Sequence, residues 1–235
     1  MSVGITNSNH AASIVRIAIV VGSTRPGRRA EMVAAWVERA GDGRSDAVFE
    51  LVDIAAFGLP MLDEPVPAAI GDYRHPHTRA WSQTIERFDG YVFVTPEYNH
   101  SVPAALKNAI DFLYREWHDK AAGLVTYGTS GGIRAGEHLR LVLAEIKVAC
   151  VRSHVTLSLG SDFEIADITE PGTFTPSGHQ QAVLERLFDE LVTWSRALRA
   201  CRPSPARPLE RFAAADQQTG PAGTAATTGG ERRGR

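Results

Sequence analysis

The chain has 235 residues, of which 43% are hydrophobic, and its formal net charge at pH 7 is -2. This length and composition suit one substantial hydrophobic core. The near-neutral balance argues against the clustered basic surface of a nucleic-acid-binding protein, so we expect small molecules or further copies of the chain as partners. Cys150 and Cys201 are the only cysteines and show no metal-ligand spacing, which argues against a disulfide framework or zinc site and favours a reducing cytoplasm.

The two ends of the chain differ in composition from its body. No apolar run approaches the ~18 residues of a membrane span, and Met1 to Ser13 lacks the basic-then-apolar layout of a signal peptide. We therefore expect no membrane association. From Arg202 onward the chain is rich in Pro, Ala, Gly, Thr and Arg, which cannot offset the entropy of ordering it. These patterns predict a flexible segment at 1–13, one domain at 14–201 and a disordered tail at 202–235.

Apolar spacing predicts that strands and helices alternate along the body. Ile14 to Val21 is a nearly continuous apolar run, typical of a strand buried on both faces. Val48 to Asp53 alternates apolar and polar residues, which indicates a more peripheral strand. Further strands are expected at 90–95, 121–127 and 151–159. Amphipathic helices are expected at 30–40, from about 78, and at 103–113, 137–148 and 178–200.

Five strands alternating with five helices predict an α/β fold in which helices cover both faces of a parallel sheet. The economical arrangement is a flavodoxin-like, doubly wound, five-stranded parallel sheet with strand order 2-1-3-4-5. Ligands of such sheets bind beyond the carboxyl ends of the strands, where the strand order changes direction. The loops after the first, third and fourth strands are therefore the candidate ligand loops.

The first of these loops is GSTRPGRRA, which runs from Gly22 to Ala30. A phosphate would be bound together by amides at a helix start, by hydroxyl groups on Ser23 and Thr24, and by guanidinium groups on Arg25, Arg28 and Arg29. The loop has neither the G-x-G-x-x-G of a dinucleotide site nor the G-K-[ST] of a P-loop, which favours a single terminal phosphate. The alternative is a Gly/Pro turn with solvated arginines.

The second loop begins at Pro96, which stiffens the backbone. Glu97, Tyr98 and Asn99 follow and offer a carboxylate, an aromatic face and an amide, a set suited to a flat polar heterocycle. Other roles stay open: Glu97 pairing with a local amide, Asn99 capping the next helix, and His100 lying at the surface.

The third loop, YGTSGGIRAG, follows the fourth strand. Gly128, Gly131 and Gly132 permit a close backbone approach to a planar ligand, and Thr129 and Ser130 add short donors. Glycine loops also serve as plain tight turns. The third loop is a candidate ligand loop because the topology places it beside the second loop.

The three segments together resemble the NADPH-dependent FMN reductase family, flavodoxin-like flavoproteins that include quinone, azo-dye and chromate reductases. GSTRPGRRA, TPEYNHSVPAALKNAIDFL and YGTSGG carry the resemblance, which spans about Ile14 to Leu159. It implies that the first loop holds the FMN phosphate and that the other two hold the ribityl chain and isoalloxazine. The cofactor-binding residues so implied are Ser23, Thr24, Arg25, Arg28, Pro96, Glu97, Tyr98, Asn99, Tyr127, Gly128, Thr129, Ser130 and Gly131.

The resemblance also implies an activity and a mode of assembly. We expect an FMN-dependent reductase that takes hydride from NADPH or NADH and passes electrons to a quinone, azo compound, metal oxyanion or free flavin. No nucleophilic triad is evident, so no general acid or base is assigned. Homodimers or dimers of dimers are implied, with Lys107, Asn108 and Asp111 in structural roles or subunit contacts.

Two other functions remain open on the sequence alone. One is a flavodoxin-like FMN electron carrier without NAD(P)H activity, and the other is a flavin-bound regulatory protein. The arginine-bearing first loop and the near-neutral charge favour the reductase over the carrier.

Overall fold

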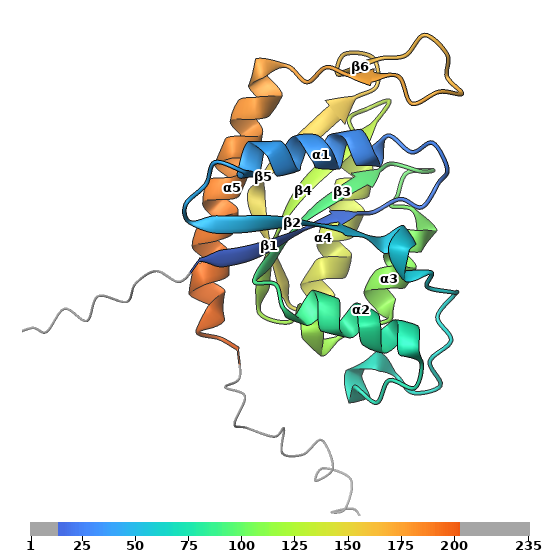
Figure 1. Cartoon of the computed structure of the whole chain (residues 1–235), viewed down its shortest axis with the longest axis vertical. Helices are drawn as coiled ribbons and strands as arrows, with labels where there is room; N and C mark the ends of the chain where they lie inside the picture. The colour runs from blue at the N-terminus through green and yellow to red at the C-terminus, as the bar shows by residue number, and fades with distance from the viewer. Residues whose placement is uncertain (1–13, 203–235) are drawn as a thin grey trace, which may run out of the picture. The chain divides into compact units, whose positions relative to one another are not determined.

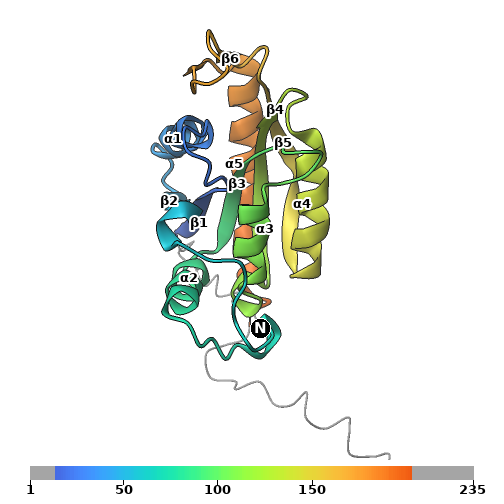
Figure 2. The same ribbon diagram turned by 90° about the vertical axis from the view of Figure 1, so that its right-hand side faces the viewer.

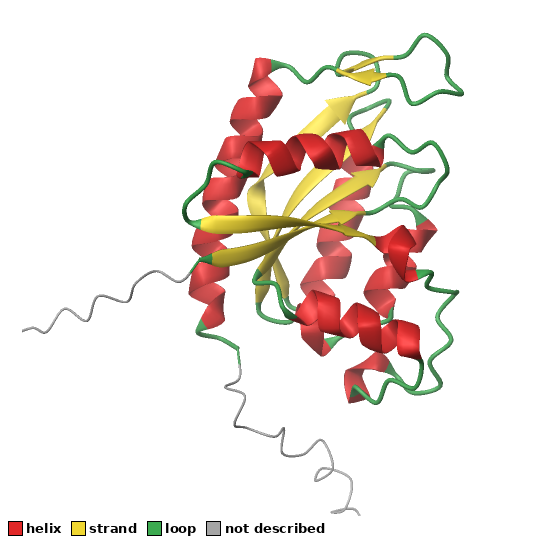
Figure 3. Cartoon of the chain, in the orientation of Figure 1, coloured by secondary structure: helices red, strands yellow, loops and turns green. Residues whose placement is uncertain are grey.

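A five-stranded parallel sheet with the order β2-β1-β3-β4-β5 lies at the centre of the fold (Figures 1 and 3). This confirms the predicted flavodoxin-like order. The strands are β1 (Val15–Val21), β2 (Ala47–Asp53), β3 (Gly90–Pro96), β4 (Lys120–Gly128) and β5 (Val148–Ser158). The computed structural model describes residues 14–202, so the expected flexible segment at 1–13 and the tail beyond Arg202 lie outside the described residues.

The burial of these strands follows their position in the sheet. β3 and β4 are buried along their whole length, because helices cover both faces of the sheet. β2 lies at the edge of the sheet, and Val48 and Leu51 are 46% and 43% exposed. The exposure of these two apolar residues therefore reflects the peripheral position of the strand.

Five helices cover the sheet, and they divide between its two faces. The helices are α1 (Ala30–Gly41), α2 (Pro76–Glu86), α3 (Ala104–Asp111), α4 (Ile133–Glu145) and α5 (Gly178–Arg199). In Figure 1, α1 lies in front of the sheet and α4 behind it. Figure 2 shows α3 and α4 running side by side.

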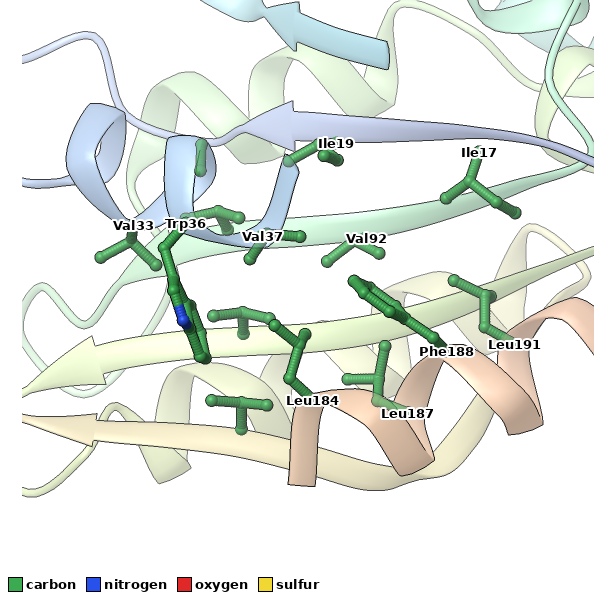
Figure 4. Close-up of a cluster of buried hydrophobic side chains, with 14 of the residues drawn as sticks. Ile17, Ile19, Val33, Trp36, Val37, Val92, Leu184, Leu187, Phe188 and Leu191 are labelled. Atoms are coloured by element: carbon green, nitrogen blue, oxygen red, sulfur yellow. The ribbon is translucent and has the colours of Figure 1, made fainter. Parts of the chain in front are cut away.

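Each face of the sheet has its own hydrophobic core. One core joins α1 and α5 to the sheet through residues such as Val37, Leu187 and Phe188 (Figure 4). The other joins α2, α3 and α4 to the opposite face and contains Trp81 and Trp117, both fully buried. Because both faces are sealed by side chains, ligand binding is left to the edges of the sheet.

The boundary between α4 and β5 differs from the prediction. The spacing predicts a helix at 137–148, whereas α4 runs from Ile133 to Glu145 and β5 already begins at Val148. Lys147 ends the helix in a left-handed conformation, with φ of 58°, and its amide donates to the carbonyl of Ala144 at 3.1 Å. This tight turn lets Val148 pair with Lys120 of β4 directly.

A small antiparallel hairpin between β5 and α5 is absent from the predicted elements. It pairs β6 (Phe163–Glu164) with β7 (Thr173–Phe174). The ring of Phe174 lies 5.0 Å from that of Phe163 and 5.4 Å from that of Trp36 on α1. Aromatic contacts therefore hold the hairpin against α1. Short 3₁₀ helices at η1 (Ile54–Phe57), η2 (Ala68–Ile70) and η3 (Arg115–Trp117) interrupt the remaining loops.

Candidate functional site

The three predicted ligand loops meet at one edge of the sheet, because parallel strands end on the same side. Val21 at the end of β1 pairs with Val94, and Pro96 at the end of β3 pairs with Tyr127. A cavity of about 90 Å³ opens at this edge. It is lined by Arg25, Arg28, Arg29, Pro96, Glu97, Tyr98, Tyr127, Gly128 and Leu159. Residues from all three loops thus surround one cavity.

The other residues predicted for the site lie near this cavity without lining it. Ser23 and Gly131 are buried beneath their loops. Asn99, Thr129 and Ser130 are exposed at the loop tips. Their positions leave them open to a ligand larger than the cavity itself.

The start of the first loop needs a glycine. A Cβ atom on Gly22 would lie 2.9 Å from Leu106 Cδ2 and 3.0 Å from the carbonyl oxygen of Val94. The hydroxyl oxygen of Ser23 lies 3.4 Å from the Arg25 amide, which donates to it, and 3.5 Å from the Tyr98 hydroxyl oxygen. Ser23 therefore shapes the first loop and connects it to the second.

Arg28 is occupied by protein partners. Its guanidinium group donates to the carboxylates of Asp53 and Glu31 and to the carbonyl oxygen of Ser23. Its side chain is only 9% exposed. Arg28 therefore ties the first loop to the end of β2, and its charge is largely neutralised by the two carboxylates.

The other two arginines of the first loop, Arg25 and Arg29, differ in whether their guanidinium groups have protein partners. Arg29 is buried and donates to the carbonyl oxygens of Glu170 and Pro171 at 2.7 and 2.8 Å, which fastens the hairpin segment to the first loop. Arg25 is exposed, and its guanidinium group donates to no residue in the range 14–202. Arg25 is thus the arginine of this loop with free donors.

The second loop contains a tight turn with an unusual backbone. Tyr98 and Ser101 exchange two backbone hydrogen bonds of 2.9 and 3.1 Å, and Asn99 and His100 between them have φ of 50° and 75°. Two positive φ values are typical of a type I′ turn, in which Asn is favoured first and Gly second. A histidine in the second position is strained and held at the surface, as expected for a turn residue.

Glu97 connects the second and third loops. Its carboxylate accepts from the Arg134 backbone amide at 3.1 Å and lies 2.6 Å from the Arg134 guanidinium group. Its own amide donates to the carbonyl oxygen of Tyr127 at 2.9 Å. The amide that Glu97 accepts from belongs to the third loop and is not a local one, so Glu97 shapes the cavity wall by joining the two loops.

The third loop folds closely against β4. A Cβ atom on Gly132 would lie 2.8 Å from the backbone nitrogen of Tyr127, and both Gly131 and Gly132 have positive φ. The Gly131 amide donates to the Gly128 carbonyl oxygen at 3.1 Å. Glycine is required here for both its φ and its lack of a side chain.

Tyr127 forms a neutral wall of the cavity. Burial raises the pKa of its phenol well above the ordinary value, and the nearby Tyr98 phenol raises it further. Only 5% of its surface is exposed. Tyr127 therefore contributes shape and apolar surface rather than charge.

Thr24 of the first loop lines a second cavity, of about 400 Å³. The remaining lining residues come from η1, the segment after it and α3: Ile54, Ala55, Gly58, Leu59, Ala105, Asn108 and Ala109. Asn108 also clamps the neighbouring segment, accepting from the Leu62 amide at 2.9 Å and donating to the Pro60 carbonyl oxygen at 2.7 Å. Asn108 thus has the structural role that was expected for it.

Within residues 14–202, no group of His, Cys, Asp and Glu side chains is arranged to hold a metal ion. None of the helices in that part of the chain has the length and apolar character needed to cross a membrane.

The sequence of the chain matches a known protein family. Residues 15–162 match the model of the family described as NADPH-dependent FMN reductase. The chain belongs to this family. The match covers all three ligand loops and ends just before the β6–β7 hairpin.

Individual FMN reductase family members support this assignment. The chain is 34% identical over 192 residues to an NAD(P)H-dependent FMN reductase of Saccharomyces cerevisiae, covering 76% of this chain and 98% of the yeast protein. It is 36% identical over 158 residues to an NAD(P)H-dependent FMN reductase of Schizosaccharomyces pombe, covering 66% and 79% of the two chains. A quinone reductase of Escherichia coli is 36% identical over 138 residues, covering 55% and 69%.

A solved structure extends the comparison to the fold. The flavoenzyme FerB, an NAD(P)H:(acceptor) oxidoreductase of Paracoccus denitrificans, superposes with a TM-score of 0.60 at 21% identity. The alignment covers 78% of this chain and 98% of FerB. At this identity the likeness supports the shared flavodoxin-like fold.

Two cavity residues are absent from the cofactor-binding residues implied by the resemblance, although Arg29 was considered with the other arginines of the first loop. Arg29 belongs to the first loop, where its neighbours Arg25 and Arg28 carry the same charge, and only its buried contacts distinguish it. Leu159 follows β5, and its amide donates to the Gly128 carbonyl oxygen at 3.1 Å. The position of Leu159 at the end of the fifth strand was the available signal.

Proposed function

We propose that the protein is an FMN-dependent NAD(P)H oxidoreductase that passes electrons to a small acceptor, namely a quinone, an azo compound, a metal oxyanion or free flavin. The observation that carries this proposal is the meeting of three loops, with donors still free, at the carboxyl edge of the sheet. Membership of the FMN reductase family and the names of the relatives support it.

The donor set of the first loop fits the phosphate of FMN. Arg25 has a free guanidinium group, and the hydroxyl groups of Ser23 and Thr24 lie beside it in the chain. A guanidinium group binds phosphate through charged, paired hydrogen bonds, which are stronger than neutral ones. We assign Arg25 as the main phosphate ligand, and Arg28 as the residue that holds the loop in place through Asp53.

The second and third loops fit the flavin ring. Pro96, Tyr98 and Gly128 line the cavity and offer flat or small surfaces to a planar group. Gly132 is buried and does not line the cavity, but its amide donates to no acceptor within residues 14–202, so we assign that amide to the ring of bound flavin. Bound FMN supplies hydride acceptance and electron transfer, so the residues of this chain need only bind it, orient it and limit access of water.

An anaerobic reduction experiment tests the proposal. The purified protein, loaded with FMN, is mixed separately with NADPH and with NADH while the flavin absorbance is followed. We expect rapid bleaching by at least one nucleotide and return of the oxidised spectrum when a quinone is added. Bound flavin that neither nucleotide reduces would favour the electron carrier instead, and a protein that binds no FMN would overturn both functions.

We propose a homodimer or homotetramer as the working assembly. Ile133 and Leu141 on α4 are 51% and 73% exposed, and α4 lies beside α3, where the family resemblance implies subunit contacts (Figure 2). Light scattering coupled to gel filtration gives the mass directly. A reducing compartment such as the cytoplasm is the proposed location, because Cys150 and Cys201 are both free thiols.

A further inference from the structure

Two consecutive hydrogen bonds connect β5 to β4 and β4 to the third loop. The Nε2 atom of His154 on β5 lies 2.9 Å from the hydroxyl oxygen of Thr126 on β4. The same hydroxyl oxygen lies 2.7 Å from the carbonyl oxygen of Gly131. His154 and Thr126 are not among the residues predicted for the site, and neither lines the cavity.

The donor and the acceptor in each of these two hydrogen bonds follow from the chemistry of the three residues. A carbonyl oxygen only accepts, so the single hydroxyl hydrogen of Thr126 is donated to Gly131. Towards His154 the hydroxyl oxygen can therefore only accept, which means that Nε2 of His154 carries hydrogen. Burial, and then the charge of Arg140, lowers the pKa of His154 to about 4, so its imidazole is neutral at pH 7 and is the Nε2–H tautomer.

Packing keeps the imidazole in this position. A Cβ atom on Gly136 of α4 would lie 2.3 Å from Cε1 of His154 and 2.9 Å from its Nε2. The ring therefore lies directly against the backbone of α4, and only a glycine at 136 leaves room for it. The sheet and the helix together hold the donor that orients Thr126.

The consequence concerns the peptide between Gly131 and Gly132. No cis peptide occurs in the described residues, and in a trans peptide the carbonyl and amide groups point in opposite directions. Because the Gly131 carbonyl is held towards Thr126, the Gly132 amide is directed away from it. That amide has no acceptor within residues 14–202.

We propose that His154, acting through Thr126, is a positioning residue that holds the Gly131–Gly132 peptide so that the Gly132 amide donates to the ring of bound flavin. This inference rests on the proposed function. Without the hydrogen bonds from His154 and Thr126, the peptide between the two glycines would have several accessible orientations, since glycine populates positive and negative φ with similar ease. His154 and Thr126 select the orientation that faces the ligand.

Four variants test the proposal through the dissociation constant for FMN, measured by quenching of flavin fluorescence. Thr126→Val removes both links, and we expect FMN affinity to fall about tenfold. His154→Phe keeps a flat ring but removes the donor, with an expected loss of about threefold. His154→Gln restores an N–H donor and should bind within about twofold of the wild type. Thr193→Val, which removes a hydroxyl bonded to the Asp189 carbonyl on α5, is the matched control and should bind like the wild type.

Two further readouts separate positioning from general loss of structure. The thermal midpoint of the apo variants reports folding, and the absorption band of bound flavin reports the hydrogen bonds to its ring, so a positioning role shifts the band in Thr126→Val but not in Thr193→Val. Equal FMN affinity and an unshifted band in both Thr126→Val and His154→Phe would overturn this inference while leaving the proposed function intact. Wild-type protein that binds no FMN would overturn the proposed function and the inference with it. Loss of affinity in His154→Gln equal to that in His154→Phe would also contradict it.

Discussion

Arg25, Arg28 and Arg29 are close neighbours in the chain but meet different surroundings. Arg28 faces Asp53 and Glu31, Arg29 faces backbone carbonyl groups, and Arg25 faces solvent at the mouth of the cavity. Guanidinium groups that already have carboxylate partners have less to gain from a phosphate than a free one. At the scale of single residues, the partners in the fold therefore decide which of three similar side chains serves a ligand.

Replacing Arg25 with Ala should weaken FMN binding without affecting folding. A hydrogen bond to a charged group contributes about 1.5 to 3 kcal/mol, so we expect FMN affinity to fall roughly tenfold or more. Fluorescence titration with FMN measures the change. Arg87→Ala is the control, because it removes an exposed partner of Glu50 and precedes β3, at the opposite end of that strand from the second loop. An Arg25→Ala protein with unchanged affinity would remove Arg25 from the site.

His100 should be dispensable, although it is the most obvious candidate base in the second loop. Its φ of 75° is a conformation that costs a non-glycine residue about 1 kcal/mol. We expect His100→Gly to raise the free energy of unfolding by up to about 1 kcal/mol in urea titrations without flavin, and to keep the rate of flavin reduction. His138→Gly, the same change within α4, should instead lower it by about 1 kcal/mol. A slower reduction in His100→Gly alone would assign His100 a part in the chemistry.

The sequence predicts that the three loops meet better than it predicts what each of their side chains contacts. Loop positions follow from the strand periodicity, which is local. The ion pairs of Arg28 with Asp53 and of Arg134 with Glu97 join different elements, so no local pattern contains them. His154 was missed for the same reason, because its partner Thr126 is close to it only after β4 and β5 have paired.

At the scale of elements, two structural features carry no strong local signal. The end of α4 has no glycine or proline stop, since Lys147 adopts the left-handed conformation itself. The β6 and β7 strands have two residues each, which is too short for an alternating pattern to appear. The hairpin is defined instead by contacts of Phe163 and Phe174, which depend on the tertiary fold. Apart from α4 and the start of β5, the five helices and the five strands of the parallel sheet were predicted close to their observed bounds.

The packing of α4 on β5 should make Gly136→Ala destabilising, although glycine to alanine in a helix normally adds stability. The new methyl group would lie 2.3 Å from the imidazole of His154, so the ring or the helix must move. Overpacking of this kind costs about 1 to 3 kcal/mol, which exceeds the helix-propensity gain of about 1 kcal/mol. Urea unfolding measures the difference. Gly43→Ala, where the added Cβ has open space around it, should change stability little, and a neutral Gly136→Ala would show that the contact is loose.

At the scale of the whole molecule, the candidate ligand site and the ion pairs that fasten the end of α5 lie at opposite ends of the parallel strands. The carboxyl ends of the strands carry the candidate site, whereas the opposite edge carries a cluster of ion pairs around Asp89. Arg199 at the end of α5 and Arg202 beyond it both donate to the Asp89 carboxylate. Arg202, which composition assigns to the tail, is therefore bonded to the domain. The length of the strands separates this edge from the ligand loops, so the ion pairs of Asp89 can be weakened without altering the candidate site.

This anchor should make folding sensitive to acid. Burial alone would raise the pKa of Asp89, but hydrogen bonds from Arg199, the Arg16 amide and Arg202 outweigh it and lower the pKa from 3.8 to about 2. A carboxylate with a depressed folded-state pKa stabilises the fold above its unfolded pKa and loses that contribution as pH falls towards the folded value. Between about pH 4 and pH 2 the free energy of unfolding should therefore drop by about 2 kcal/mol on account of Asp89. Urea unfolding across this range should show a shallower pH dependence for Asp89→Asn and a wild-type dependence for Asp72→Asn, an exposed partner of Arg74. Equal slopes in Asp89→Asn and the wild type would mean that other carboxylates govern acid unfolding.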